Sequence, residues 1–317
     1  MLDLAVIIVT WNVRDLVLAA LSSLLDDLAG SGLAASVIVV DNASSDGTPQ
    51  AIAETFPTVD LIANSENLGF VRGNNVALRA LGFERQNCPL EKLPRAVYLL
   101  NPDTITQPGA TRALFDALFE DPRRGLVGAR LTYGDGSFQH SAFSFPGLRQ
   151  LWAEFFPTPG RWIEGRFNGR YPKWRYETGV PFEVDAVLGA TMMLRRETVL
   201  STGLFDETFF MYCEELDWAR RIWAAGWSVC CVPSAHVVHL GGQSAGQVRP
   251  FSLEMLWRSR LYLIQKHYPA WKAMFARLII RIGMTRKRRQ FAKEPLAESE
   301  RAALDQACAH IQQMAAR

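Results

Sequence analysis

An acidic corner follows a short apolar run at Asn101-Pro102-Asp103. Residues 96–100 have the composition of a buried strand, and Pro102 ends it because proline lacks the N–H that a sheet ladder needs. The carboxylate of Asp103 therefore follows a strand end, where open α/β sheets bind ligands. A carboxylate beside an amide oxygen suits a hard divalent cation that also binds phosphate oxygens. Asn-Pro-Asp is equally suited to a simple turn.

A second acidic group comprises Glu214, Glu215 and Asp217. Residues 216–225 have helical spacing and Gly226 follows them, so these acids crowd a helix N-terminus, where the helix dipole favours negative charge. The dipole does not explain the apolar run at 209–212, which directs the acids towards the interior. Burial can raise the pKa of a carboxylate towards that of a general base. His239, before a Gly-Gly pair, is either a metal ligand or an ordinary loop histidine.

Alternating strands and helices must position these groups. Strands are predicted at 4–10, 36–40, 59–63 and 96–100, and helices at 13–28, 49–55, 76–81 and 110–120. This order predicts a parallel sheet with helices on both faces. Polar residues follow successive strands at Thr10, Asp41 and Asn67. Each has a local explanation as a cap or turn residue, but the series favours a nucleotide site. No GxGxxG or P-loop motif is present in the sequence.

The second half is predicted from weaker patterns. Strands are expected at 125–131 and 227–232, the last ending near Pro233. A further sheet segment is expected at 183–194, and a turn at 134–137. Residues 143–181 are rich in aromatic residues without a period, and are either a poorly ordered insertion or a loop region that shapes an acceptor pocket. Beyond residue 245, a continuous amphipathic helix is expected at 251–282 and a polar helix at 294–317.

Length and composition exclude several classes. A chain of 317 residues with 49% hydrophobic and 21% charged residues is globular. A net charge of +2 gives no indication of a nucleic-acid partner. Five cysteines without a paired framework suggest reduced thiols and a cytoplasmic location. The apolar N-terminus has the pattern of a strand rather than of a signal peptide, and no uncharged run reaches the roughly 20 residues of a membrane span.

Several motifs together resemble the family-two glycosyltransferases of GT-A fold, especially their bacterial rhamnosyltransferase-like branch. They are Thr10-Trp11-Asn12, the run Val39 to Thr48, Asn67-Leu68-Gly69-Phe70 with Gly73-Asn74-Asn75, Leu100 to Asp103, and Tyr212 to Asp217. The resemblance covers about residues 4–245. It implies a GT-A fold, with a Rossmann-like nucleotide-binding half (1–104) and a mixed central sheet, an acceptor half (105–245), and a helical appendage (246–317).

The same resemblance implies an inverting transferase that uses Mg²⁺ or Mn²⁺ and a nucleotide-sugar donor, with dTDP-rhamnose as first choice and UDP-hexoses second. The acceptor would be a hydroxyl of a glycan or of a lipid-linked sugar in cell-wall or surface-polysaccharide synthesis. The residues implied to line the nucleotide are Thr10, Asn12, Asp41, Asn67, Gly69, Asn74 and Asn101. Asp103 and His239 would bind the metal, with Asn101 replacing the first acid of the family's Asp-x-Asp motif. Glu215 is the favoured base, with Glu214 and Asp217 as further catalytic candidates.

The chemistry supports this set of residues. A departing diphosphate develops negative charge, which a cation near Asp103 stabilises, and the attacking hydroxyl needs a carboxylate to accept its proton. Glycosidases would need two carboxylates flanking the bond and no nucleotide site. Two alternatives stay open: a nucleotidyltransferase, although its glycine-rich phosphate loop is lacking, and a non-catalytic sugar-nucleotide-binding protein.

The C-terminal region suggests a membrane surface. An apolar series lies directly before a basic segment, 281–293, centred on Arg286-Lys287-Arg288-Arg289. Either this apolar face packs on the catalytic domain and the basic segment is solvated, or both lie on an anionic membrane at the inner face of the cell. The apolar series is Leu253, Leu256, Trp257, Leu261, Tyr262, Ile264, Phe275, Leu278, Ile279 and Ile282.

Overall fold

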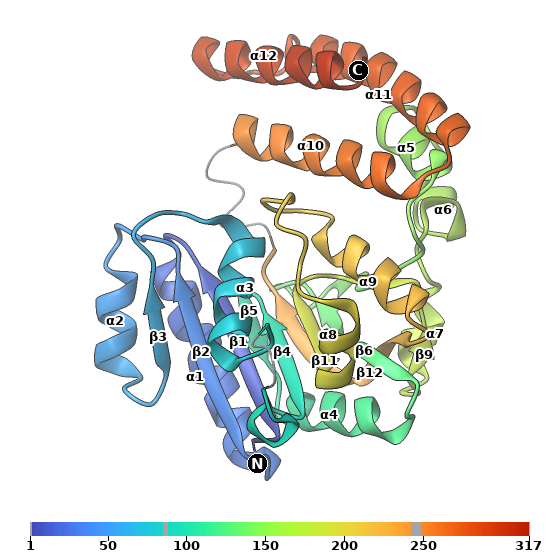
Figure 1. Ribbon diagram of the computed structural model, residues 1–317. Coiled ribbons are helices and arrows are strands. Elements are labelled where there is room, and N and C mark those ends of the chain that lie inside the picture. Colours follow the sequence, from blue (N-terminus) through green and yellow to red (C-terminus); the bar gives the residue numbers. More distant parts are fainter. Residues whose placement is uncertain (1, 85–87, 242–248, 317) are drawn as a thin grey trace. The chain divides into compact units, whose positions relative to one another are not determined.

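A computed structural model describes residues 2–84, 88–241 and 249–316 (Figure 1). The chain forms two compact units. The first comprises Met1–Phe143, Lys173–Phe210 and Glu215–Ser244, and the second comprises Ser144–Pro172, Met211–Glu214 and Ala245–Arg317. The sequence places a boundary at residue 245, which lies outside the described residues. It does not anticipate that residues 144–172 join the second unit.

The first unit is built on a mixed sheet with the strand order β3-β2-β1-β4-β11-β6-β12-β5. Its first four members are parallel: β1 (Leu4–Thr10), β2 (Ala35–Asp41), β3 (Asp60–Ala63) and β4 (Ala96–Leu100). Every residue of β1 and β4 is buried, as expected for parallel strands covered on both faces. The helices α1 (Arg14–Ser31), α2 (Thr48–Thr55) and α3 (Gly69–Leu81) connect them. This half agrees closely with the predicted alternation.

The other half of the sheet mixes directions. Strand β11 (Thr191–Arg195) is antiparallel to β4 and to β6 (Arg124–Thr132). Strand β12 (Ser228–His239) is parallel to β6, and β5 (Thr104–Thr106) closes the edge antiparallel to β12. The remaining elements of this unit are η1 (Leu90–Lys92), α4 (Ala110–Glu120), β7 (Phe138–Gln139), β8 (Ala142–Phe143), α7 (Lys173–Glu177), β9 (Phe182–Glu183), β10 (Ala186–Val187), α8 (Arg196–Thr202) and α9 (Glu214–Ala224).

Two local predictions are wrong for identifiable reasons. Strand β12 does not stop at Pro233, because a register irregularity between Val232 and His236 accommodates the proline. Helix α3 begins at Gly69 instead of residue 76, although Gly and Asn are weak helix formers. The predicted sheet segment 183–194 is confirmed, and it comprises β9, β10 and the start of β11.

The second unit is helical. Its long helices are α10 (Arg249–His267), α11 (Ala270–Phe291) and α12 (Glu298–Met314), and α12 packs against both of the others. Residues 144–172 supply α5 (Leu148–Phe155), α6 (Gly160–Ile163) and η2 (Arg166–Asn168). The ring of Phe155 stacks on that of Trp257, with centroids 4.8 Å apart, in the core of this unit.

The expected continuous helix at 251–282 is wrong. Pro269 is the N-cap of α11 and adopts an extended backbone, so it separates α10 from α11. A proline also disfavours helical geometry in the residue before it. None of the described helices is long and apolar enough to cross a membrane.

Candidate active site

Asp103 and His239 meet at one edge of the sheet in the first unit. Strand β5 pairs with β12 so that Thr104 lies opposite His239, and the N–H of Leu240 donates to the carbonyl of Asp103 at 2.9 Å. This pairing holds His239 Nε2 3.4 Å from Asp103 Oδ1, and both side chains are buried. Two residues predicted separately as metal ligands are therefore neighbours.

Gln139 fixes the orientation of the His239 ring. Its Oε1 lies 3.2 Å from His239 Nδ1, and an amide oxygen can only accept, so Nδ1 carries the hydrogen. The Nε2 atom then faces the carboxylate of Asp103. Two acceptors at this distance need a proton or a cation between them.

The pair fits a divalent cation. The carboxylate of Asp103 suits Mg²⁺ or Mn²⁺, and an imidazole nitrogen such as His239 Nε2 is a common metal ligand. Within the described parts of the chain, no three His, Cys, Asp or Glu side chains form a metal-binding group. Mg²⁺ usually needs only one or two protein carboxylates when substrate phosphates complete its ligands. The residues present therefore fit a metal that binds together with a phosphorylated donor.

Asn101 follows the central strand β4, two residues before Asp103. Its backbone N–H donates to Ala190 at 3.0 Å, and its carbonyl accepts from the Thr104 hydroxyl at 2.7 Å. The side-chain Oδ1 is buried, and among the described residues it has no hydrogen-bond partner. A buried acceptor without a partner is destabilising unless a ligand satisfies it.

Glu215 packs beside Gly189, the residue that precedes Ala190. A Cβ atom placed on Gly189 would lie 3.8 Å from the Cβ of Glu215, and the next residue, Ala190, binds Asn101. Glu215 is half-buried, whereas the preceding Glu214 is buried. The small Gly189 leaves space beside this side chain.

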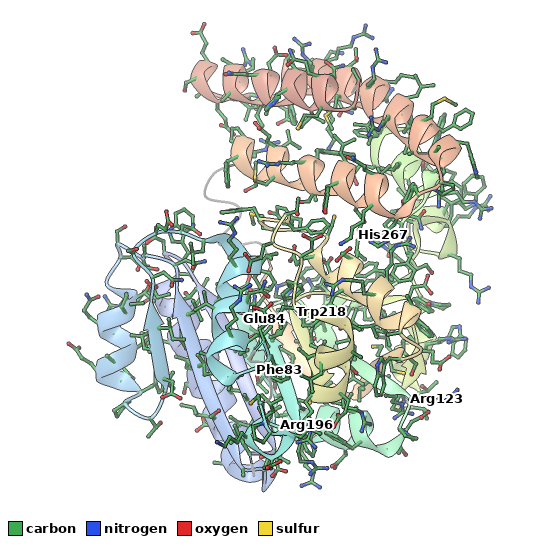
Figure 2. All side chains as sticks on the ribbon, viewed as in Figure 1. Phe83, Glu84, Arg123, Arg196, Trp218 and His267 are labelled. Carbon is green, nitrogen blue, oxygen red and sulfur yellow. The ribbon has the colours of Figure 1, made fainter. Side chains whose placement is uncertain are left out.

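The two neighbouring acids lie in different surroundings. Glu214 is buried. Asp217 is fully buried, and its Oδ2 lies 3.0 Å from Nε of Arg221, which also donates to the carbonyl of Thr202. On the same helix, Trp218 (labelled in Figure 2) is fully buried and donates to the Thr202 hydroxyl at 2.8 Å. The contacts of Asp217 are those of a residue that anchors α9.

Thr10 and Asp41, two of the residues predicted to line the nucleotide, are neighbours in the sheet. They lie opposite each other at the carboxyl ends of β1 and β2, and both are buried. Asp41 Oδ2 accepts the N–H of Ser44 at 2.9 Å. Asp41 Oδ1 and the Thr10 hydroxyl have no hydrogen-bond partner within the described residues. These atoms can receive N–H or O–H donors of a nucleoside.

Asn12, Asn67 and Asn74 make local hydrogen bonds. Asn12 Oδ1 accepts the N–H of Ser45 at 2.8 Å, which ties the loop after β1 to the loop after β2. Asn67 Oδ1 accepts the N–H of Gly69, and Asn74 donates to the carbonyl of Phe70, both at 2.9 Å. Asn67 and Asn74 thus stabilise the start of α3, and their part in nucleotide binding stays a prediction.

Backbone strain coincides with these loops. Among the described non-glycine residues, positive φ occurs at Asn12 (51°), Ala43 (60°), Tyr212 (69°) and Cys213 (66°). The first two belong to the predicted nucleotide loops, and the last two directly precede Glu214. Such conformations cost of order 1 kcal/mol or more each and concentrate at functional sites.

Gly69 has a steric role. Its φ is +78°, and an added Cβ would lie 2.7 Å from both the ring and the carbonyl oxygen of Phe210. That carbonyl accepts the N–H of Phe70 at 3.0 Å. Only glycine lets the start of α3 approach the segment that leads to the acidic residues.

Sequence reasoning missed two residues of the site. Gln139 lies in a two-residue strand after a turn, in no motif, and no signal in the sequence marks it. Gly189 lies in the predicted sheet segment 183–194. A glycine within a strand indicates that another part of the chain packs closely against it, but the sequence does not show that this part is Glu215.

Comparison with known proteins agrees with this architecture. The family model described as "Glycosyl transferase family 2" matches residues 5–178. The N-acetylglucosaminyl-diphospho-decaprenol L-rhamnosyltransferase of Mycobacterium tuberculosis is 31% identical over 277 residues, which cover 81% of this chain and 87% of that protein.

Two solved structures share the fold. The mannosyltransferase PcManGT of Pyrobaculum calidifontis, in complex with GDP-Man and Mn²⁺, has a TM-score of 0.53 at 18% identity and covers 99% of this chain and 86% of its own. TarS 1-349 of S. aureus has a TM-score of 0.50 at 13% identity, with 98% and 90% covered. The fold is therefore GT-A, as predicted. With the matched family model and the strand-end site, the chain belongs to glycosyl transferase family 2.

Proposed function

We propose that this chain transfers L-rhamnose from dTDP-rhamnose to a hydroxyl of a polyprenyl-diphosphate-linked N-acetylglucosamine, at a membrane surface on the inner side of the cell. The mycobacterial relative's name supports both the sugar and the acceptor. UDP-hexoses are the second choice of donor. The observation that carries the proposal is the contact of Asp103 with His239, two residues after Asn101, whose buried Oδ1 lacks a partner among the described residues.

The donor would bind across the carboxyl ends of β1, β2 and β4. The buried Asp41 Oδ1 and Thr10 hydroxyl, which lack partners among the described residues, would bind the nucleoside. Asp103 and His239 would hold Mg²⁺ or Mn²⁺, with the Asn101 amide oxygen directed to the same region. The bound metal supplies positive charge that stabilises the departing diphosphate.

Glu215 would act as the general base. The acceptor oxygen forms a bond to the anomeric carbon while its proton passes to the Glu215 carboxylate. The bond from the anomeric carbon to the diphosphate oxygen breaks, and its electron pair remains on the diphosphate. Attack opposite the leaving group inverts the anomeric centre. The half-buried position of Glu215 beside Gly189 suits a base that must contact the acceptor.

The test is a transfer assay with the full chain, dTDP-rhamnose, a short-chain polyprenyl-diphosphate-GlcNAc and Mn²⁺ or Mg²⁺. We expect metal-dependent release of dTDP and a rhamnosylated product, and loss of both with EDTA. Asp103→Ala should lower the rate by at least about 100-fold. Asp60→Ala is the matched control, because Asp60 is an exposed acid on β3. Transfer unaffected by EDTA or by Asp103→Ala would refute the metal role.

Donor identity is tested in the same assay. Replacing dTDP-rhamnose by UDP-hexoses should reduce turnover, and preferred use of a UDP-hexose would overturn the choice of rhamnose. Binding of either donor without any transfer to the acceptor would favour a non-catalytic sugar-nucleotide-binding protein.

A further inference from the structure

Helix α11 is apolar on two faces. One face is buried in the core of the second unit through Ala276, Ile280, Gly283 and Met284. Gly283 lets the ring of Phe155 approach so closely that an added Cβ would clash with it. A helix in a globular protein normally has one apolar face and a polar opposite face. The second apolar face of α11 therefore requires a separate explanation.

The second face is exposed. At 100° per residue, its members lie on the side of the helix opposite Ile280. They are between 46% and 61% exposed, and Trp271 and Phe275 lie with ring centroids 6.5 Å apart. A contiguous exposed apolar stripe is uncommon on soluble proteins and marks an interaction surface. The members are Trp271, Met274, Phe275, Leu278 and Ile282.

The same exposed side becomes basic towards the end of α11. Arg281, Arg286 and Arg289 are exposed, and Arg289 lies in line with Trp271 and Leu278 on the helix. Within the described residues, none of these three arginines forms an ion pair. The exposed side of α11 is therefore apolar for three turns and cationic for the last two.

The structure corrects the predicted composition of this surface. Trp257, Leu261 and Ile264 are buried in the core of the second unit and cannot belong to it. Two of the four central basic residues have partners inside the unit. Lys287 Nζ lies 3.7 Å from Glu154, and Arg288 Nε lies 2.6 Å from Asp305.

We propose that the exposed side of α11 binds an anionic lipid bilayer, with Trp271, Met274, Phe275, Leu278 and Ile282 in the interfacial region and Arg281, Arg286 and Arg289 at the headgroups. Large apolar side chains beside arginines are the composition of helices that lie in a membrane interface. The cationic end favours anionic lipid over a second copy of this basic surface, since like charges repel. This inference rests on the proposed lipid-linked acceptor for its biological purpose, but not for its physical basis.

The test is co-sedimentation of the full chain with vesicles, without donor or acceptor. Wild-type protein should pellet with vesicles containing phosphatidylglycerol and much less with pure phosphatidylcholine, and 1 M NaCl should weaken binding. A Phe275→Ser, Leu278→Ser, Ile282→Ser variant should bind at least about tenfold more weakly. An Arg281→Gln, Arg286→Gln, Arg289→Gln variant should lose the preference for anionic lipid.

A control variant that loses the same number of positive charges tests whether vesicle binding depends on this surface or only on the net charge of the protein. Lys92, Arg112 and Arg123 are exposed basic residues of the first unit, and Arg123 is labelled in Figure 2. Replacing all three with Gln removes the same charge, and vesicle binding should stay near wild type. Equal binding by the apolar variant and wild type, or no binding by wild type, would overturn the proposal.

Self-association is the competing outcome. Analytical ultracentrifugation would then show a dimer for wild type and a monomer for the apolar variant, and wild type would not pellet with vesicles. That combined result would mean that a second copy of the chain covers this face. Transfer to a water-soluble acceptor should be unchanged in the α11 variants. Failure of lipid binding is thereby distinguishable from failure of the proposed transferase activity.

Discussion

Gln139 Oε1 lies 3.2 Å from Nδ1 of His239, on the side of the ring opposite Asp103. This contact places the hydrogen on Nδ1 and leaves Nε2 directed at the carboxylate. Residues that orient a metal-binding histidine typically change metal affinity 10- to 100-fold when removed. Gln139 is therefore a positioning residue in the proposed site.

We predict that Gln139→Leu weakens Mn²⁺ binding by about 10-fold or more in the presence of dTDP, because the leucine cannot accept the Nδ1 hydrogen. Electron paramagnetic resonance of free Mn²⁺ measures this affinity without any turnover. Gln139→Glu keeps an acceptor oxygen and should restore most of the binding. If Gln139→Leu bound Mn²⁺ as tightly as wild type, Gln139 would have no positioning role in the metal site.

Gly69→Ala should destabilise the protein more than Gly109→Ala. Both glycines have positive φ, +78° and +83°, but an added Cβ meets Phe210 at 2.7 Å in the first case and nothing within 4 Å in the second. Gly109→Ala should cost about 1 kcal/mol from backbone strain alone, and Gly69→Ala a further 1–3 kcal/mol from the clash. Urea unfolding measures both. If both variants lost the same free energy of unfolding, the segment around Phe210 would have to shift to admit the added methyl group at no cost.

Glu207 should make stability depend on acidic pH. Its Oε1 accepts from Asn75 at 3.0 Å and lies 2.6 Å from Arg79. The Asn75 hydrogen bond, followed by Arg79, holds the pKa of Glu207 below its ordinary value of 4.5. Since the folded-state pKa is the lower one, this contribution is full above about pH 4.5 and is lost as the pH falls through the folded-state pKa.

The matching measurement compares wild type with Glu207→Gln. Wild type should have the larger free energy of unfolding at pH 7, and the difference should shrink as the pH falls below 4.5. A difference that stays constant over this range would show that the charge of Glu207 does not contribute. Asn75 also donates to the carbonyl of Phe205 and accepts its N–H, so this cluster stabilises the segment leading to Phe210.

The parallel half of the fold was predictable because its signals are local. Each of β1, β2 and β4 is a continuous apolar run whose end is marked by a polar residue or Pro102. Asp103 and His239 were both identified by residue type, but their contact depends on the pairing of β5 with β12 across more than 130 residues. Gln139 contacts His239 and Gly189 packs beside Glu215 only because the fold brings distant segments together, so no local sequence motif marks either residue.

In the helical region, the sequence predicts the helices but not which of their side chains are buried. Apolar residues in 251–282 predict a helix correctly, but periodicity alone does not show which apolar side chains are covered. Trp257 is fully buried while Trp271 is 60% exposed, and only packing within the second unit distinguishes them. Likewise, the partners of Lys287 and Arg288 lie on other helices, α5 and α12, so the sequence does not distinguish these two basic residues from their neighbours.

The choice of Glu215 as the base gives the most discriminating prediction. Glu215→Gln is nearly isosteric but cannot accept a proton, so turnover should fall by about 10²- to 10⁴-fold while dTDP-rhamnose binding stays near wild type. Calorimetric titration of the donor and single-turnover product formation measure the two effects separately.

Glu214→Gln and Asp217→Asn are the matched controls on the same helix. Glu214 is buried, and Asp217 is fully buried with its carboxylate on Arg221. Asp217→Asn should lower the free energy of unfolding, because it leaves a partly buried guanidinium without its charged partner. Glu214→Gln should keep activity within a few-fold of wild type. If Glu214→Gln were inactive and Glu215→Gln active, the base would be Glu214, and the packing of Glu215 beside Gly189 would have a structural role only.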